Sequence, residues 1–117
     1  MKPTHMGAIL ISTSNGDAMA RFYRDNLGLP LKEERHGPHA HWGCELGSLH
    51  FAIHPDPKAK IGSGVAFSLE VSDVDAAVAD LKRLGVKIEM EAQDRPFGRL
   101  ASVRDPDGNL VYLHKDP

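Results

Sequence analysis

In residues 7–13 Ile9 and Ile11 define one apolar face, and in residues 64–71 Val65, Phe67, Leu69 and Val71 do so; this period of two predicts β-strands. After each strand the period lengthens to three and four residues, which predicts a helix with one apolar stripe. The stripes consist of Met19, Phe22, Tyr23 and Leu27 in the first helix, and of Val74, Ala77, Val78, Leu81 and Leu84 in the second. Each helix is followed by three short extended segments, which cover 30–35, 40–46 and 49–54 in the first half and 86–91, 99–104 and 109–114 in the second.

Both predicted helices carry start and stop residues. Ser14 and Ser72 each stand three residues before an acid, a spacing that is typical of an N-cap and a first helical turn. Gly28 and Gly85 directly follow the last apolar residue of each stripe, and glycine commonly ends a helix in the left-handed conformation. We therefore expect the helices to begin at these serines and to end at these glycines.

The whole pattern occurs twice. Residues 11–18 match 69–76 at an offset of 58, residues 27–31 match 84–88 at an offset of 57, and residues 54–57 match 114–117 at an offset of 60. Three matches in the same order predict an internal duplication. One copy alone would leave one face of its sheet bare as a large apolar surface. The predicted fold is therefore α+β, with two tandem βαβββ modules whose mixed sheets curl around a shared cleft and whose helices lie outside.

This interpretation treats residues 1–117 as a single domain. The first module covers about 7–54 and the second about 64–114. The segment between them, 55–63, is rich in proline, glycine and charge, which is typical of a linker.

The composition narrows the class of protein. The 117 residues include 14 Lys and Arg against 16 Asp and Glu, so the chain lacks the cationic surplus that binding to nucleic acid requires. The longest apolar run near the start, 8–11, is far shorter than the roughly 20 residues that cross a bilayer. We therefore expect a cytoplasmic protein with neither nucleic acid nor membrane as a partner. The single cysteine, Cys44, has no partner for an internal disulfide.

Several short motifs carry a family resemblance. They are Phe22-Tyr23 followed by 27–29, then the runs 71–77, 95–99 and 105–109. Together they resemble the vicinal oxygen chelate superfamily, which includes glyoxalases, extradiol dioxygenases, fosfomycin-modifying enzymes and bleomycin-binding resistance proteins. The resemblance covers residues 7–114 and implies the fold more specifically than the activity, because these motifs mostly encode turns and helix ends. It also implies a homodimer whose ligand clefts use parts of both chains.

The resemblance further implies four inward-pointing positions where metal-using relatives supply His, Glu or Gln ligands. In this chain those positions hold Ala8, Ala52, Ala66 and Tyr112. A methyl group donates no lone pair, and a phenol with a pKa near 10 is a poor ligand for a divalent metal at neutral pH. We therefore expect that the chain lacks the usual metal centre. His5 is three residues before the matching first-strand position, and a bulge would be needed to bring it into place.

Without metal ligands, the cleft should bind an organic molecule. Strand alternation turns Leu49, Phe51 and Ile53 toward the helices, so that His50 and His54 face the cleft. The full set of candidate ligand-binding residues is Trp42, His50, His54, Ser68, Glu70, Tyr112 and His114. The ring of Trp42 either stacks on a planar ligand or fills core volume, and the sequence leaves both interpretations open.

Two further groups of residues have alternative interpretations. His54 and His114 occupy equivalent places in the two copies, either as strand-end residues in solvent, as contacts to an organic ligand, or as an unconventional metal site with Glu70. The last hairpin carries three arginines that either receive an anionic ligand or pair with nearby acids. These arginines are Arg95, Arg99 and Arg104, and the acids are Asp94, Asp105 and Asp107.

The sequence thus predicts a small-molecule binding protein of the glyoxalase and bleomycin-resistance type. It should hold an aromatic or polycyclic ligand in a dimeric cleft without a cofactor, and no catalytic residue is assigned. The alternative is a metal-dependent lyase or dioxygenase that binds a divalent metal through displaced ligands. Those ligands would come from His5, His50, His54, Glu70 and His114. A third interpretation is a metal-free isomerase in which His50 or Glu70 is the general base.

Overall fold

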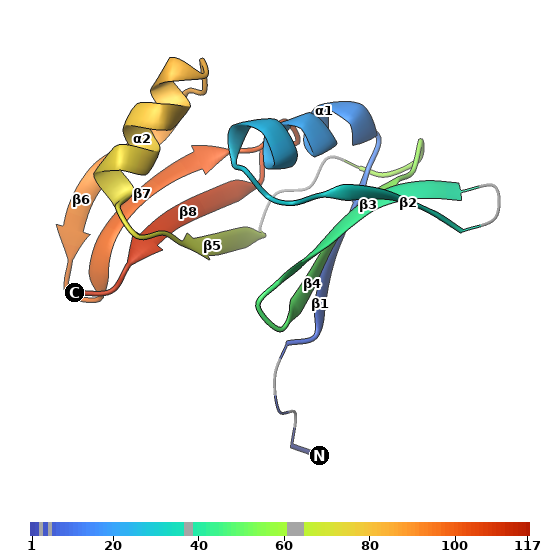
Figure 1. Cartoon of the computed structure of the whole chain (residues 1–117), viewed down its shortest axis with the longest axis horizontal. Helices are drawn as coiled ribbons and strands as arrows, with labels where there is room; N and C mark the ends of the chain where they lie inside the picture. Colours follow the sequence, from blue (N-terminus) through green and yellow to red (C-terminus); the bar gives the residue numbers. More distant parts are fainter. Residues whose placement is uncertain (3, 5, 37–38, 61–64) are drawn as a thin grey trace. The chain divides into compact units, whose positions relative to one another are not determined.

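The computed structural model describes residues 1–2, 4, 6–36, 39–60 and 65–117 (Figure 1). The chain divides into two compact units, Met1–Ile61 and Gly62–Pro117. Each unit contains one four-stranded mixed sheet and one helical segment, in the order β-α-β-β-β. This confirms the predicted α+β class and the repeated module, whereas a cleft shared by the two modules stays a prediction. No helix within these described ranges has the length and apolar character to cross a membrane.

The first unit has the strand order β1-β4-β3-β2. Strand β1 (Ala8–Thr13) is parallel to β4 (Leu49–Pro55), which pairs antiparallel with β3 (His39–Leu46), which in turn pairs antiparallel with β2 (Lys32–His36). The α-helix α1 (Gly16–Arg21) continues as a π-helical segment, η1 (Phe22–Asn26). The core of this unit holds Met19, Phe22, Tyr23, Phe51 and Ile53, all of which are buried. Most of the apolar faces predicted for the first helix and for 49–54 therefore form this core, whereas Leu27 and Leu49 are only half-buried.

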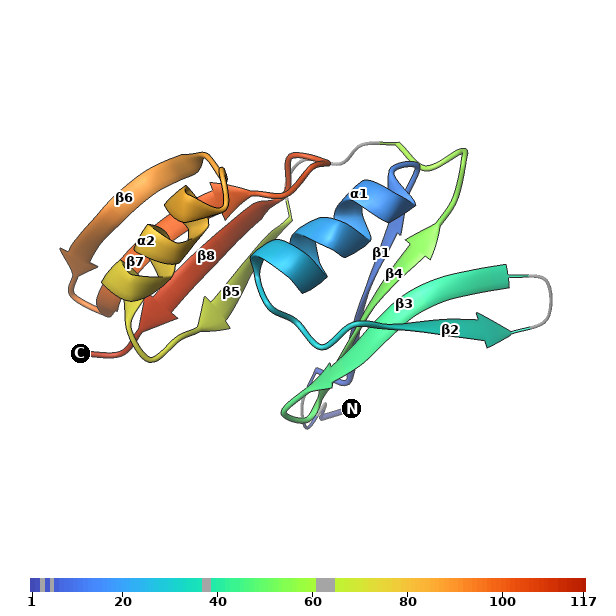
Figure 2. The same ribbon diagram turned by 45° about the horizontal axis from the view of Figure 1, so that its top comes forward.

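The second unit repeats this arrangement, with the strand order β5-β8-β7-β6. Strand β5 (Ala66–Glu70) is parallel to β8 (Leu110–Lys115), and β7 (Gly98–Arg104) pairs antiparallel with both β8 and β6 (Ile88–Arg95). Helix α2 (Val74–Arg83) lies across one face of β6, β7 and β8 (Figure 2). Its buried residues Val74 and Val78 pack against Ala101. The opposite face, called the open face below, carries the exposed Ser68 and Glu70 and the half-buried Tyr112 and His114.

Strand pairing follows the repeat that is visible in the sequence. Ala8 pairs with His50 in the first sheet, and Ala66 pairs with Leu110 in the second. These pairs are related by offsets of 58 and 60 residues, the same offsets that align the two halves of the sequence. The register also makes His54 equivalent to His114, because His54 pairs with Ser12 and His114 pairs with Glu70.

The predicted helix ends were partly wrong. The N-caps are Asn15 and Asp73, one residue after the predicted serines. The Asp73 carboxylate accepts a hydrogen bond from the amide of Ala76 at 3.0 Å, and a carboxylate caps a helix as well as a hydroxyl does. The glycine stops were right, since Gly28 and Gly85 have φ of 78° and 79°.

Two elements depart from simple periodicity. In η1 the amide of Leu27 donates to the carbonyl of Phe22 at 3.0 Å, five residues back, whereas the apolar stripe predicted an unbroken α-helix. Strand β6 extends to Arg95 although the sequence predicted an end at 91, and its register shifts on both sides of Met90. Such bulges break the alternation from which strands are predicted. Leu84, predicted for the apolar stripe, is 53% exposed and lies one residue beyond the end of α2.

Candidate functional site

The open face of the second sheet gathers four of the predicted site residues. Ser68 pairs with Tyr112, and Glu70 pairs with His114, on the adjacent parallel strands β5 and β8. Side chains two residues apart lie on the same side of a strand, so these four side chains share one face. The intervening Val111 and Leu113 are buried on the other face, which α2 covers. Alternation along two paired strands thus builds this part of the site.

A pocket of about 410 Å³ lies on this open face. Its lining consists of Ser68, Glu70, Phe97, Leu100, Tyr112 and His114. Phe97 comes from the turn between β6 and β7, and its side chain is 57% exposed. The pocket therefore has two aromatic rings and one leucine on its walls and an acid and an imidazole at one end.

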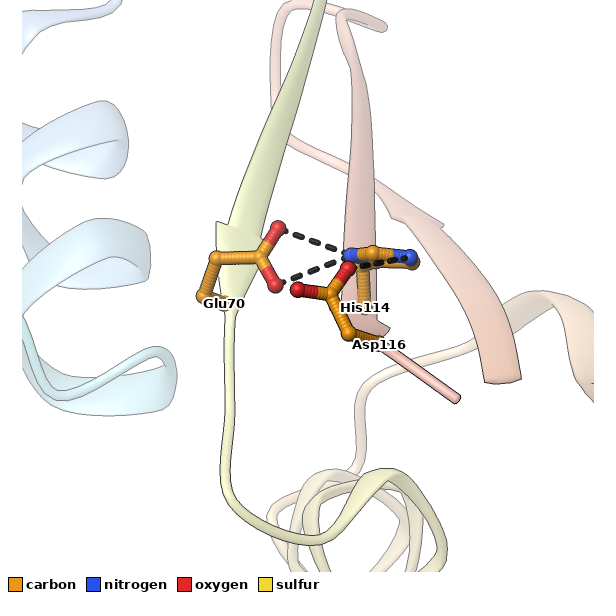
Figure 3. Close-up of side chains that lie close together, drawn as sticks. All are labelled: Glu70, His114 and Asp116. Carbon is orange, nitrogen blue, oxygen red and sulfur yellow. Dashed lines mark hydrogen bonds and ion pairs between the residues drawn. The ribbon is translucent and has the colours of Figure 1, made fainter. Parts of the chain in front are cut away.

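His114 connects the parts of this pocket. Its Nδ1 lies 2.8 and 2.9 Å from the two carboxylate oxygens of Glu70 (Figure 3). Its Nε2 lies 2.9 Å from the carbonyl oxygen of Phe97. The imidazole is only 13% exposed, whereas the Glu70 carboxylate is 65% exposed. The rings of Phe97 and His114 have centroids 6.1 Å apart. One side chain therefore ties β5, β8 and the β6–β7 turn together.

Both ring nitrogens of His114 face oxygen acceptors, so the doubly protonated imidazolium satisfies all of these contacts. The Phe97 carbonyl, followed by Glu70, raises the pKa of His114 above its ordinary value of 6.5. A metal ligand must instead offer a lone pair from one nitrogen. His114 is therefore arranged as a hydrogen-bond donor on both sides.

Glu70 and His114 also belong to a group of side chains that could be considered as metal ligands. Among the described residues, one set of three donor side chains, Glu70, His114 and Asp116, brings its ligand atoms within 4.8 Å of one another. These are suitable ligand types for a divalent metal, but metal binding to His114 would break its bond to either Glu70 or Phe97. The Asp116 carboxylate is 86% exposed, at 3.8 Å from Nε2. This set does not fit a resident metal as it stands.

The positions implied by the family resemblance fit a metal no better. Ala8 and Ala66 are exposed, Ala52 is fully buried, and Tyr112 lines the pocket with its phenol. Three of these four side chains end in a methyl group that cannot coordinate an ion. His5 lies outside the described residues, so the hypothesis that it replaces Ala8 stays untested.

The open face of the first sheet carries the other predicted histidines. His50 lies 2.6 Å from Glu45 through Nδ1. His54 stacks on His41, with ring centroids 4.5 Å apart and planes at 8°, and Nε2 of His41 lies 3.0 Å from Glu34. The sequence placed His50 and His54 on one face correctly, but it missed both of their neighbours. Whether His54 meets His114 stays a prediction, because the two residues belong to different units.

Trp42 lies on the helix side of the first sheet. It pairs with Ile53, which is fully buried, and a Cβ added to Gly16 at the start of α1 would lie 3.1 Å from Cζ3 of the indole. Gly16 thus leaves room for the edge of the ring. This placement favours the core interpretation of Trp42 over stacking on a ligand at the open face.

The arginines of the last hairpin are mostly paired. Arg99 makes two hydrogen bonds to Asp75, at 2.8 and 2.9 Å, and a third to Asp94 at 2.9 Å, and this pairing lowers the pKa of Asp75. Arg104 contacts Glu89 and the carbonyl of Gly108 rather than Asp105 or Asp107. Within the described ranges, Arg95 has no such partner. Arg99 therefore joins α2 to β7 as a structural residue.

Two pocket residues were missed by sequence reasoning. Leu100 lies on β7 beside His114 and is only 8% exposed. In the sequence nothing distinguishes it from an ordinary core leucine. Phe97 is part of a motif that carried the family resemblance, but a residue in a turn has no periodicity to assign its direction. An aromatic residue between Pro96 and Gly98 in a turn was the available signal.

Comparison with known proteins places this geometry in a family. The model of the Glyoxalase/Bleomycin resistance protein/Dioxygenase superfamily matches residues 5–113. The chain belongs to this superfamily. Among curated proteins, the uncharacterized protein YraH of Bacillus subtilis (strain 168) is 32% identical over an alignment of 108 residues, and the match covers 80% of this chain and 84% of YraH.

Solved structures show that the superfamily fold is used for different purposes. The antibiotic binding protein TnmS3 from Streptomyces sp. CB03234 is 23% identical, with a TM-score of 0.78 over 100% of this chain and 99% of TnmS3. The lactoylglutathione lyase from Agrobacterium tumefaciens is 20% identical, with a TM-score of 0.75 over 97% of this chain and 94% of the lyase. Since a binding protein and an enzyme share this superfamily fold, the side chains of the site must distinguish between them.

Proposed function

We propose that this protein binds a small aromatic or polycyclic molecule in the pocket on the open face of its second sheet, without a resident metal. The observation that carries the proposal is the lining of this pocket, in which Phe97, Leu100 and Tyr112 surround a polar end formed by Glu70 and His114. Its volume of about 410 Å³ falls within the range of about 300 to 1,000 Å³ that is usual for small-molecule sites.

The chemistry of the walls supports a planar ligand. Aromatic rings prefer offset-stacked or edge-to-face contacts with other rings, and the exposed side chain of Phe97 is held beside His114 by the bond to its own carbonyl. The hydroxyl groups of Ser68 and Tyr112 can orient polar groups of the ligand. The description of TnmS3 as an antibiotic binding protein adds support for this ligand class.

The arrangement of His114 supports binding without a metal. Both nitrogens already take part in hydrogen bonds, and the positions that relatives use for metal ligands carry no imidazole or carboxylate. The competing proposal is a metal-dependent lyase or dioxygenase. Elemental analysis of the protein purified without an affinity tag separates the two, because a metal enzyme should retain a stoichiometric ion or be activated by added Ni, Zn, Fe or Mn.

The binding proposal is tested by titrating a panel of planar antibiotics and other polycyclic aromatics by calorimetry, with ¹⁵N amide shifts to locate the site. We expect binding tighter than millimolar, with shifts in β5, β8 and the β6–β7 turn. Phe97→Ala should weaken it about tenfold through lost ring contacts. Leu84→Ala is the matched control, since Leu84 is equally exposed, at 53% against 57%, and does not line the pocket.

Three outcomes would contradict the proposal. The first is that no compound of the panel binds better than millimolar. The second is that the shifts map away from the pocket, or that Leu84→Ala weakens binding as much as Phe97→Ala does. The third is that the untagged protein contains a stoichiometric metal.

A further inference from the structure

One wall of the pocket in the second unit belongs to a turn that is bound by His114. The turn between β6 and β7 contains Phe97, whose side chain lines the pocket. Nε2 of His114 lies 2.9 Å from the carbonyl oxygen of Phe97, and this bond joins residues 17 positions apart in the chain. Because Phe97 is 57% exposed, packing of its own ring does little to fix it. The bond from His114 therefore holds this wall in place.

That bond exists only while Nε2 carries a proton, because a carbonyl oxygen accepts a hydrogen bond and cannot donate one. The other ring nitrogen, Nδ1, lies 2.8 and 2.9 Å from the two carboxylate oxygens of Glu70, which accept in the same way when the acid is ionised (Figure 3). An imidazolium has two N–H groups and serves both acceptors, whereas a neutral imidazole has one. Loss of a proton from His114 therefore removes one of these two interactions.

The interaction with the turn is the one that is lost. A hydrogen bond to an ionised carboxylate is stronger than one to a neutral carbonyl, so the remaining proton of His114 stays on Nδ1, facing Glu70. Nε2 then presents a lone pair to the carbonyl oxygen of Phe97, and two acceptors at 2.9 Å repel each other. Neutral His114 thus pushes the turn away instead of binding it.

The charged groups that face the imidazole favour its protonated form. Glu70 approaches from β5, and the carboxylate of Asp116, beyond the end of β8, lies 3.8 Å from Nε2. The neighbouring side chain from β7 is the uncharged Leu100. The Phe97 carbonyl, followed by Glu70, raises the pKa of His114 above its ordinary value of 6.5. The change between the two forms is therefore shifted toward neutral pH.

We propose that His114 is a proton-controlled latch on the pocket of the second unit. Protonated His114 holds the β6–β7 turn against β8 and keeps Phe97 in the pocket wall, and neutral His114 releases the turn. The pocket is complete only in the latched form, so ligand affinity falls with the latched fraction as the pH rises. A bound ligand must in turn favour proton uptake by His114, since the two equilibria are linked. This inference rests on the proposed function, because the latch acts on the same pocket.

The latch is tested first on the whole protein without a ligand. The ¹⁵N shifts of the imidazole follow the titration of His114, and nuclear Overhauser contacts between the rings of His114 and Phe97 follow the turn. These rings have centroids 6.1 Å apart, and we expect their contacts to weaken with the midpoint of the His114 titration. The same midpoint should appear in the amide shift of Gly98, which is joined to the Phe97 carbonyl.

The matched control for this titration is His41→Gln. His41 is as shielded as His114, with 12% of its side chain exposed against 13%, and its Nε2 likewise lies 3.0 Å from a glutamate, Glu34. It belongs to the first unit and does not line the pocket. The titration of the Gly98 amide should persist in His41→Gln and disappear in His114→Gln.

The second measurement follows ligand binding across the same pH range. The probe is acridone, a fluorescent planar tricycle that stays uncharged, so that a change in affinity comes from the protein. We expect its dissociation constant to rise about tenfold across the His114 titration, which corresponds to a fall of the binding-competent fraction to about a tenth. His114→Gln should bind acridone with one affinity at every pH, and His41→Gln should behave as the wild type does.

The outcomes separate the latch from the binding proposal. Ring contacts that stay constant while His114 titrates would overturn the latch. A constant dissociation constant for acridone would also overturn it and leave the binding proposal intact, and so would a pH dependence that persists in His114→Gln. Absence of binding by acridone and by the rest of the panel at every pH would overturn both.

Discussion

Gly98 is the first residue of β7 and lies directly after the β6–β7 turn, beside the end of β8. Its φ is 137°, a backbone conformation that residues with a side chain rarely adopt. A Cβ added here would lie 2.2 Å from the carbonyl oxygen of Lys115 and 2.6 Å from Nε2 of His114. The first of these atoms belongs to the backbone, so the Gly98→Ala protein cannot relieve the contact by turning a side chain.

The magnitude follows from two costs. Holding a non-glycine residue in a sparsely populated conformation costs about 1–3 kcal/mol, and crowding a packed region costs about 1–3 kcal/mol more. We expect Gly98→Ala to lower the free energy of unfolding by about 3 kcal/mol. For a chain of this length that is a fall in Tm of about 12 °C. Gly85→Ala should cost about 1 kcal/mol, because Gly85 has a φ of 79° but nothing within 4 Å of the added Cβ.

Urea unfolding of the wild type and both variants measures the two costs separately. Because the turn must move away from β8, Gly98→Ala should also break the bond between Nε2 of His114 and the Phe97 carbonyl, and ligand binding in that pocket should weaken with it. Equal losses of stability in Gly98→Ala and Gly85→Ala would refute the steric argument. Unaltered binding in Gly98→Ala would refute the view that this turn shapes the pocket.

Two other predictions concern the second unit. Asp105→Ala should lower the free energy of unfolding in urea by about 4 kcal/mol. The reason is that the buried carboxylate accepts hydrogen bonds at 2.8–2.9 Å from the amides of Asp107 and Asn109 and from the Asn109 side chain. A loss below about 1 kcal/mol would show that these donors find other partners. The stability advantage of the wild type over His114→Gln should be complete below the ordinary imidazole pKa of 6.5 and disappear as the pH rises through the higher pKa of folded His114. An advantage that grows with pH would contradict this sign.

Alternation and repeat spacing predicted most of the fold, because buried and exposed faces of a strand must alternate. They also placed Ser68, Glu70, Tyr112 and His114 on one face. They could not supply the position of Phe97, whose direction is set by a turn and by a hydrogen bond from a residue 17 positions away.

Pairings between side chains were harder to predict than faces. The contacts of His50 with Glu45 and of Arg99 with Asp75 depend on cross-strand register and on helix placement, which no local pattern encodes. The extension of β6 was missed because its bulges disturb the period of two. Trp42 lies on the same side of its strand as Cys44 and Leu46, which favours the core. The alternating polar and glycine residues fit the wall of a cleft equally well, so the sequence alone could not decide which side Trp42 faces.

The identical pairing of Ser12 with His54 and of Glu70 with His114 has an evolutionary consequence. Main-chain hydrogen bonds and the side chains that face the helix maintain the fold of each copy. The alternate residues along these strands face away from the helix and are not needed for the fold. Duplication of such a unit gives one polypeptide two sheet faces whose side chains can change without loss of the fold. Each surface can acquire its own ligand chemistry by substitutions that leave folding intact.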